Sequence, residues 1–80
     1  MNDQGIMSRI NELLDEERAL REAEAAGEID DPGRERMHEL EVALDQAWDL
    51  LRQRRARRDF GENPDEVEER PPEVVENYLQ

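Results

Sequence analysis

The feature that most constrains this chain is a pair of long amphipathic segments separated by a turn of only a few residues. In the first segment, apolar residues recur at the spacing of one helical face, with two more on its flank: Ile6, Ile10, Leu13 and Leu20, then Met7 and Leu14. This pattern predicts a helix over residues 4–26. Asn2 or Asp3 can cap its start, and Gly27 is suited to the position just beyond its last turn.

Residues 27–33 read GEIDDPG and form the predicted turn. Asp30 or Asp31 can cap a second helix, and Pro32 suits a first helical turn because its missing N–H costs nothing there. That second helix is predicted over residues 32–60. Its apolar residues step by three and four, as in a heptad seam: Met37, Leu40, Leu44, Ala47 and Leu51. The short turn then makes the two helices antiparallel.

The apolar arc of the second segment is wider than a two-helix hairpin needs. Trp48 extends the seam on one flank, and Ala43 and Leu50 extend it on the other, so that the arc spans roughly 160°. Chains this short usually need disulfides, a metal or a partner subunit, and this one has no cysteine. We therefore expect a homodimer in which two hairpins form a four-helix bundle. Trp48 is expected in the core or at the subunit interface.

Residues 61–80 form a mostly acidic extension with three of the four prolines and a single base, Arg70. Asn63 and Pro64 predict a capped helical turn, and residues 72–80 predict a second short one. Neither would be stable alone. Tyr78 and Leu79 could anchor the extension on its own hairpin or on a foreign partner, or the extension could be disordered.

An arginine run is the chain's one basic feature, within residues 52–58: Arg52, Arg54, Arg55, Arg57 and Arg58. It could bind nucleic acid or an acidic protein. No aromatic residue interleaves the run as base stacking would require. The alternative is structural: the run stabilises a helix C-terminus, the stems of Arg55 and Arg58 cover core, and the acidic extension folds back onto it.

Glu17 and Glu24 fall inside the apolar stripe of the first helix. Either both are solvated, or Glu17 meets an arginine or the Trp48 indole N–H across an interface. A single polar residue in a seam can set register and subunit number, so Glu17 is a candidate for that role.

The sequence offers no arrangement typical of an enzyme, cofactor site or metal site. His38 is the only histidine and is expected to be exposed, and Ser8 is the only serine. No apolar run approaches the length of a membrane span, and the first residues lack the pattern of a signal peptide. We expect a cytoplasmic protein with no cofactor, no metal and no membrane association.

Several stretches together resemble a known family. They are residues 40–46, residues 48–58, and Arg70-Pro71, Val75-Glu76 and Tyr78-Leu79-Gln80 in the extension. The family comprises small, uncharacterised actinobacterial proteins that share a domain of unknown function. The resemblance implies a bacterial cytosolic helical protein and supplies no activity, cofactor or binding residues.

The sequence thus predicts an all-α protein with a helical hairpin over residues 1–60 and an acidic extension over 61–80. The function it favours is a non-catalytic interaction or adaptor protein that binds a cytosolic protein by helix-face packing. The alternative is nucleic-acid association through the arginine run, masked by the acidic extension. Candidate interaction residues are Trp48, Leu51, the five arginines, Tyr78 and Leu79.

Overall fold

The computed structural model describes residues 2–79 and is all-α in that range, as predicted. The main elements are α1 (Asp3–Ala25) and α2 (Asp31–Asp59), followed by a 3-10 turn η1 (Pro64–Glu66) and a short helix α3 (Pro72–Leu79). The two predicted long helices are confirmed to within one residue at each end. Met1 and Gln80, the outer limits of the two predicted regions, lie outside the described residues.

Side-chain caps fix where α1 and α2 begin. Asn2 Oδ1 accepts a hydrogen bond from the Gly5 N–H at 2.8 Å, and Asp30 Oδ1 accepts one from the Gly33 N–H at 2.8 Å. Asn2 or Asp3 was predicted to cap the first helix, and Asp30 or Asp31 the second. Asn2 and Asp30 are the residues that do so. Each cap satisfies an amide that has no partner within the first helical turn.

The same left-handed glycine signal ends both long helices. Gly27 has a φ of 71° and Gly61 a φ of 73°. After each of them, an N–H reaches back into the helix: Glu28 to the Ala23 carbonyl at 2.8 Å, and Glu62 to the Arg57 carbonyl at 2.8 Å. This closing geometry favours glycine because a Cβ strains the positive φ.

A single apolar cluster holds α1 against α2. Its buried members are Ile6, Ile10, Leu13, Leu40, Leu44, Ala47, Leu50 and Leu51. They are residues of the two predicted stripes, with Leu50 from the flank. Leu51 therefore lies in the core and presents no surface to a partner. Trp48 is 37% exposed, so the core alternative for this residue was wrong.

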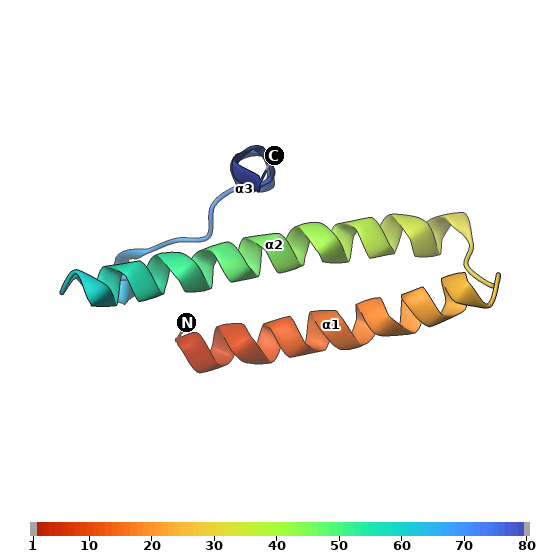
Figure 1. The fold of residues 1–80 in the computed structure, drawn as a ribbon, viewed down its shortest axis with the longest axis horizontal. Helices are drawn as coiled ribbons and strands as arrows, with labels where there is room; N and C mark the ends of the chain where they lie inside the picture. Colours follow the sequence, from red (N-terminus) through yellow and green to blue (C-terminus); the bar gives the residue numbers. More distant parts are fainter. Residues whose placement is uncertain (1, 80) are drawn as a thin grey trace.

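The extension packs on its own hairpin, which is one of the three alternatives for it. Figure 1 shows α2 in the middle, with α1 along one side and α3, seen end-on, on the other. Both η1 and α3 contact α2. Val67 packs against the core, and Val75 is 1% exposed. Of the large apolar residues of α3, Val75 is thus docked, while Val74, Tyr78 and Leu79 remain exposed.

Candidate interaction surface

A half-buried ion pair attaches the extension to the back of α2. The Asp49 side chain is 3% exposed and the Arg70 side chain 36%. Arg70 Nε donates to Asp49 Oδ2 at 2.9 Å, and Arg70 Nη2 pairs with Asp49 Oδ1. Gln53 Nε2 also donates to Asp49 Oδ2 at 2.9 Å. The guanidinium lowers the pKa of Asp49 because it favours the ionised carboxylate more than burial disfavours it.

Arg70 also fixes the start of α3. Its carbonyl accepts a hydrogen bond from Gln46 Nε2 at 3.2 Å, and its guanidinium lies 5.8 Å from the centre of the Tyr78 ring. One residue therefore connects the side of α2 with the last turn of α3. Together with the burial of Val75, these contacts determine how α3 sits on the hairpin.

A second carboxyl group lies at the contact between α2 and α3. Glu76 is half-buried, and its Oε1 is buried without a hydrogen-bond partner among the described residues. A hydrogen bond with Asp45, followed by burial, raises the pKa of Glu76. The charge of His38 lowers the pKa of the same carboxyl, and the charge of Glu41 raises it.

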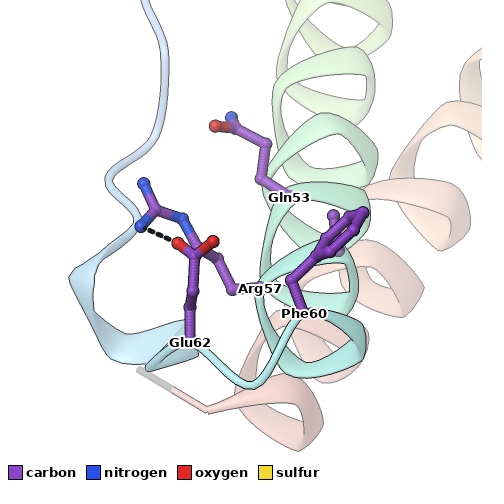
Figure 2. A pocket seen from close by; sticks show the side chains of 5 residues that line it. Gln53, Arg57, Phe60 and Glu62 are labelled. Atoms are coloured by element: carbon purple, nitrogen blue, oxygen red, sulfur yellow. Dashed lines mark hydrogen bonds and ion pairs between the residues drawn. The ribbon is translucent and has the colours of Figure 1, made fainter.

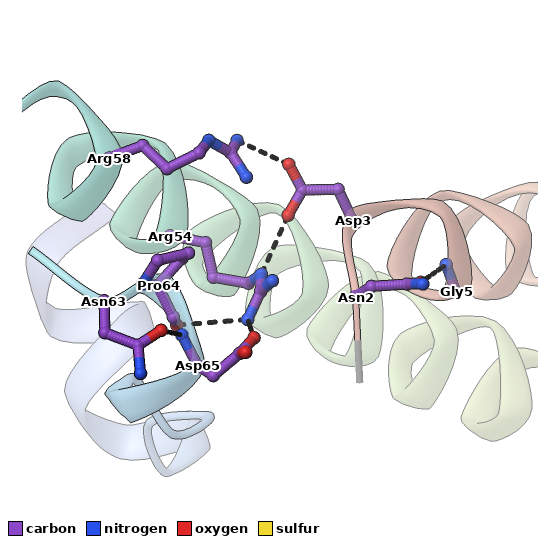
Figure 3. Close-up of polar contacts among 8 residues, drawn as sticks. All are labelled: Asn2, Asp3, Gly5, Arg54, Arg58, Asn63, Pro64 and Asp65. Carbon is purple, nitrogen blue, oxygen red and sulfur yellow. Dashed lines mark hydrogen bonds and ion pairs between the residues drawn. The ribbon is translucent and has the colours of Figure 1, made fainter.

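Arg54 joins three segments of the chain (Figure 3). It is only 5% exposed, and its Nε donates to Asp3 Oδ1 at 2.8 Å. Its Nη1 donates to the Pro64 carbonyl and to Asp65 Oδ1, both at 3.0 Å. Arg58 Nη2 pairs with the other oxygen of Asp3 at 2.5 Å. The two guanidinium groups, Arg58 first, lower the pKa of Asp3 to about 2.

Arg57 pairs with an acid of the extension. Its Nη1 lies 2.7 Å from Glu62 Oε2 (Figure 2). Phe60, which is 81% exposed, stands beside this pair at the end of α2. An open pocket of about 340 Å³ lies here, lined by Gln53, Ala56, Arg57, Phe60 and Glu62.

The arginine run is therefore largely engaged within the molecule. Arg54, Arg57 and Arg58 are paired with acids of the N-terminus and the extension. In the structural alternative the stems of Arg55 and Arg58 cover core, but both residues are exposed, and Arg54 is the buried one. The reason is that Arg54 lies between the start of α1 and η1, where it bonds to Asp3, the Pro64 carbonyl and Asp65. Within residues 2–79, Arg52 and Arg55 have no ion-pair partner within 4.0 Å.

One long edge of the hairpin carries exposed apolar side chains. Arg21 Nη2 lies 3.3 Å from Glu41 Oε1, which sets the register of α1 against α2 on this edge. Leu14 is seven residues before Arg21, and Trp48 is seven residues after Glu41. Because seven residues are close to two helical turns, Leu14 lies opposite Trp48 on this edge. They are 36% and 37% exposed.

The opposite edge of the hairpin is polar. Arg36 Nη2 lies 2.8 Å from Glu16 Oε2, and Arg36 Nη1 lies 3.2 Å from Glu39 Oε2. Glu17, whose side chain is 15% exposed, belongs to the Leu14–Trp48 edge, where it pairs with Arg21 on its own helix at 3.3 Å. Its proposed part in setting subunit register stays a prediction. Both edges thus carry ion pairs, and the Leu14–Trp48 edge also exposes two large apolar side chains.

Exposed apolar side chains of α3 flank its docked residue, Val75. Val74 is 44%, Tyr78 74% and Leu79 50% exposed. Val74 and Tyr78 are one helical turn apart and lie on one flank of Val75, whereas Leu79 is one turn after Val75 and lies on its other flank. We call these three residues the α3 surface.

The residues that position the extension were missed in the sequence. Asp49 stands among apolar neighbours in α2, and its partner is 21 residues away, so periodicity gives no signal for the pair. Arg70, as the only base of the extension, was the one available hint. Asp3 and Asp65 were indistinguishable from the many other surface acids.

Neither a metal-binding cluster nor a membrane-spanning helix is found in the described part of the chain. No group of three or more His, Asp or Glu side chains in residues 2–79 is arranged to hold a metal ion. None of the helices between these residues is long and apolar enough to cross a membrane. His38 is exposed, as predicted.

Comparison with known proteins identifies the family. Residues 2–80 match the family described as "Protein of unknown function (DUF2630)", and the chain belongs to it. Among its relatives are one uncharacterized protein of Mycobacterium bovis and two from strains of Mycobacterium tuberculosis. Each is 42% identical over 77 residues, which cover 95% of this chain and 88% of the relative. The predicted actinobacterial family is thereby confirmed. No solved structure matches the chain significantly.

Proposed function

We propose that this member of the DUF2630 family is a non-catalytic protein-binding protein that docks on a cytosolic partner protein through the α3 surface. The observation that carries the proposal is the exposure of Val74, Tyr78 and Leu79 on a helix that the half-buried Asp49–Arg70 ion pair holds on α2. The chain would act as an adaptor, with no chemistry of its own.

The way α3 is attached supports this proposal. A helix of eight residues is far shorter than the ~12–15 that an isolated helix needs, so α3 depends on its contacts with α2. Among those contacts are one buried valine, the Asp49–Arg70 pair and the bond from Gln46 to the Arg70 carbonyl. An ion pair with a buried carboxylate is a poor source of stability but a good determinant of geometry. We therefore regard the pair as a device that orients α3.

The composition of the α3 surface also suits recognition. Tyrosine gives a large contact area with few rotatable bonds, and aromatic residues are enriched at interaction hot spots. Val74 and Leu79 add apolar area beside Tyr78. Glu73 and Asn77 are exposed on the same helix and would form part of a polar rim.

Nucleic-acid association is the weaker proposal. Counterion release requires cations that are free to meet phosphates. Three of the five arginines in the run are paired within the molecule, and the formal net charge is -12. Binding of RNA or DNA would first have to break these pairs.

The test is recovery of partner proteins from the native cell by the tagged full-length chain. The informative variant is Val74→Ser with Leu79→Ser, which leaves the Tyr78 ring under Arg70. Its matched control is Phe60→Ser, which removes an exposed apolar side chain outside α3. We expect the same partner with the wild type and the control, and loss of that partner with the α3 variant.

Hydrogen exchange on the α3 amides checks that the double variant keeps α3 docked. Recovery of the same partner by wild type and double variant alike would contradict the proposal. So would the absence of any specific partner for all three proteins.

A further inference from the structure

We propose that a second copy of this chain packs on the Leu14–Trp48 edge, with the two α2 helices antiparallel and each Trp48 beside the two-fold axis. In this dimer Arg55 of each chain lies against Glu41 of the other. The inference goes beyond the proposed function, which uses the α3 surface. The two proposals concern different surfaces and are tested independently.

The apolar part of the edge is the starting point. Trp48 and Leu14 lie opposite each other on the edge that carries the Arg21–Glu41 ion pair, and each is exposed by about a third. A tryptophan buries a large apolar area when it is covered. Covering these two side chains would also add buried apolar area to the small core that α1 and α2 form.

The charges along this edge favour a second copy of the chain as the molecule that binds there. Glu41, Trp48 and Arg55 are spaced seven residues apart, so they lie on one stripe of α2. Each charged residue is therefore about 10 Å along the helix from Trp48. Arg55 is exposed and, within residues 2–79, has no acidic partner. Glu41 pairs with Arg21 of its own chain at 3.3 Å, and its side chain is still 44% exposed, so it can also accept an arginine from a second copy.

This stripe is complementary to itself when one copy is reversed. A two-fold axis beside Trp48 brings position 55 of one chain opposite position 41 of the other, twice over. That is the condition for an isologous interface, in which residue i contacts j and j contacts i. A parallel arrangement would instead place Arg55 against Arg55 and Glu41 against Glu41, which is unfavourable.

The same axis is consistent with the other helix of the hairpin. Because Leu14 lies opposite Trp48, the axis that pairs the two tryptophans also brings the two Leu14 side chains together. The product is a four-helix arrangement of two α1 and two α2 helices. The chain has no cysteine, so burial between copies is a route to stability that remains for such a short chain.

The test measures the mass in solution by sedimentation equilibrium for the wild type, Arg55→Glu, Glu41→Arg, and an equimolar mixture of the two variants. We expect the wild type at twice 9.4 kDa. Each variant alone should dimerise at least about tenfold more weakly, because two like-charge contacts replace two favourable ones. The mixture should regain dimers. In a mixed dimer the two substituted positions face each other with opposite charges, and the native Arg55 of one chain still meets the native Glu41 of the other.

The matched control is Glu39→Arg. Glu39 pairs with Arg36 on the polar edge, so this change introduces an intrachain like-charge contact, as Glu41→Arg does with Arg21. It should leave the dimer intact. The emission of Trp48, the only tryptophan, gives a second readout on the unmodified protein. It should shift to shorter wavelength as the protein concentration rises.

A wild type that stays monomeric, with Trp48 emission independent of concentration, would overturn the inference. A dimer that tolerates both charge reversals, or a mixture that does not recover, would overturn it as well. Neither result would affect partner recovery through the α3 surface, so the two proposals can fail independently.

Discussion

The hairpin and the extension are held to the same helix, α2, by different physical means. Between α1 and α2, eight buried apolar residues form one continuous cluster, and the ion pairs lie at its edges. Within residues 61–79 the extension is anchored by two apolar side chains, Val67 and Val75. Its other contacts are ion pairs and hydrogen bonds: Arg70 to Asp49, Arg54 to Asp65 and Arg57 to Glu62.

This difference shows that the two regions need not unfold together. Apolar burial is non-directional and sums over the length of the hairpin. A few polar contacts are directional, and the loss of one can release a whole short helix. We therefore expect the hairpin to carry the global stability, and the extension to open locally at a lower free energy.

The largest expected effect is on the hairpin core. Leu40 is fully buried, so Leu40→Ala should lower the free energy of unfolding by about 2–5 kcal/mol. Chemical denaturation would measure the loss. As a control, Phe60→Ala removes a larger but exposed side chain and should change stability by about 0.5 kcal/mol at most. A Leu40→Ala protein as stable as this control would refute the account of the core.

The next effect should be confined to the extension. Asp49→Asn removes the charge that Arg70 pairs with, and we expect the docking of α3 to weaken by about 1–3 kcal/mol. Faster hydrogen exchange should appear in α3 and not in the α1–α2 core. Asp15→Asn is the control, because Asp15 is an exposed acid in a surface pair with Arg18. Equal loss of protection throughout the chain would argue against separate opening.

The same difference explains what the sequence could predict. Ile10 and Leu44 belong to repeating patterns along single helices, so their burial was predictable from local spacing alone. Trp48 lies at a helical position that extends the apolar seam of α2. The side chains of α1 nevertheless leave it 37% exposed. Arg54 lies against the start of α1 and η1, and Asp49 against Arg70, so both contact segments outside α2. No local pattern distinguished Arg54 from Arg55, or Asp49 from the surface acids.

A smaller effect concerns the Glu76 carboxyl and depends on pH. Asp45 raises the pKa of Glu76, so this group favours docking below its ordinary pKa and loses that contribution as the pH rises through the raised value. His38 and Glu41 face the same carboxyl and are present in both proteins compared. Glu76→Gln should therefore slow α3 exchange at neutral pH and have little effect near pH 4.

That comparison uses exchange rates corrected for the intrinsic effect of pH. Faster α3 exchange in Glu76→Gln at neutral pH would mean that the carboxylate helps to dock the helix. The account of the Glu76–Asp45 contact would then be wrong.

The smallest effect should appear in acid, where the two regions meet at Arg54. The pKa of Asp3 is about 2, below its ordinary 3.8, so its contribution is complete above the ordinary value and is lost as the pH falls through about 2. We expect the first turn of α1 to loosen between about pH 4 and 2. NMR titration of the Asp3 carboxyl would follow this, and a midpoint at the ordinary value would contradict the pairing with Arg58 and Arg54.

The most direct test of the separation between hairpin and extension is residue-resolved hydrogen exchange of the wild-type chain across a urea series. We predict that α3 amides exchange through a local opening, with a lower free energy and a shallow urea dependence. Amides around Leu40 and Leu44 should exchange only through global unfolding, with a steep dependence. If α3 and the middle of α2 showed the same opening free energy and the same urea slope, the two regions would form one cooperative unit and the account would be wrong.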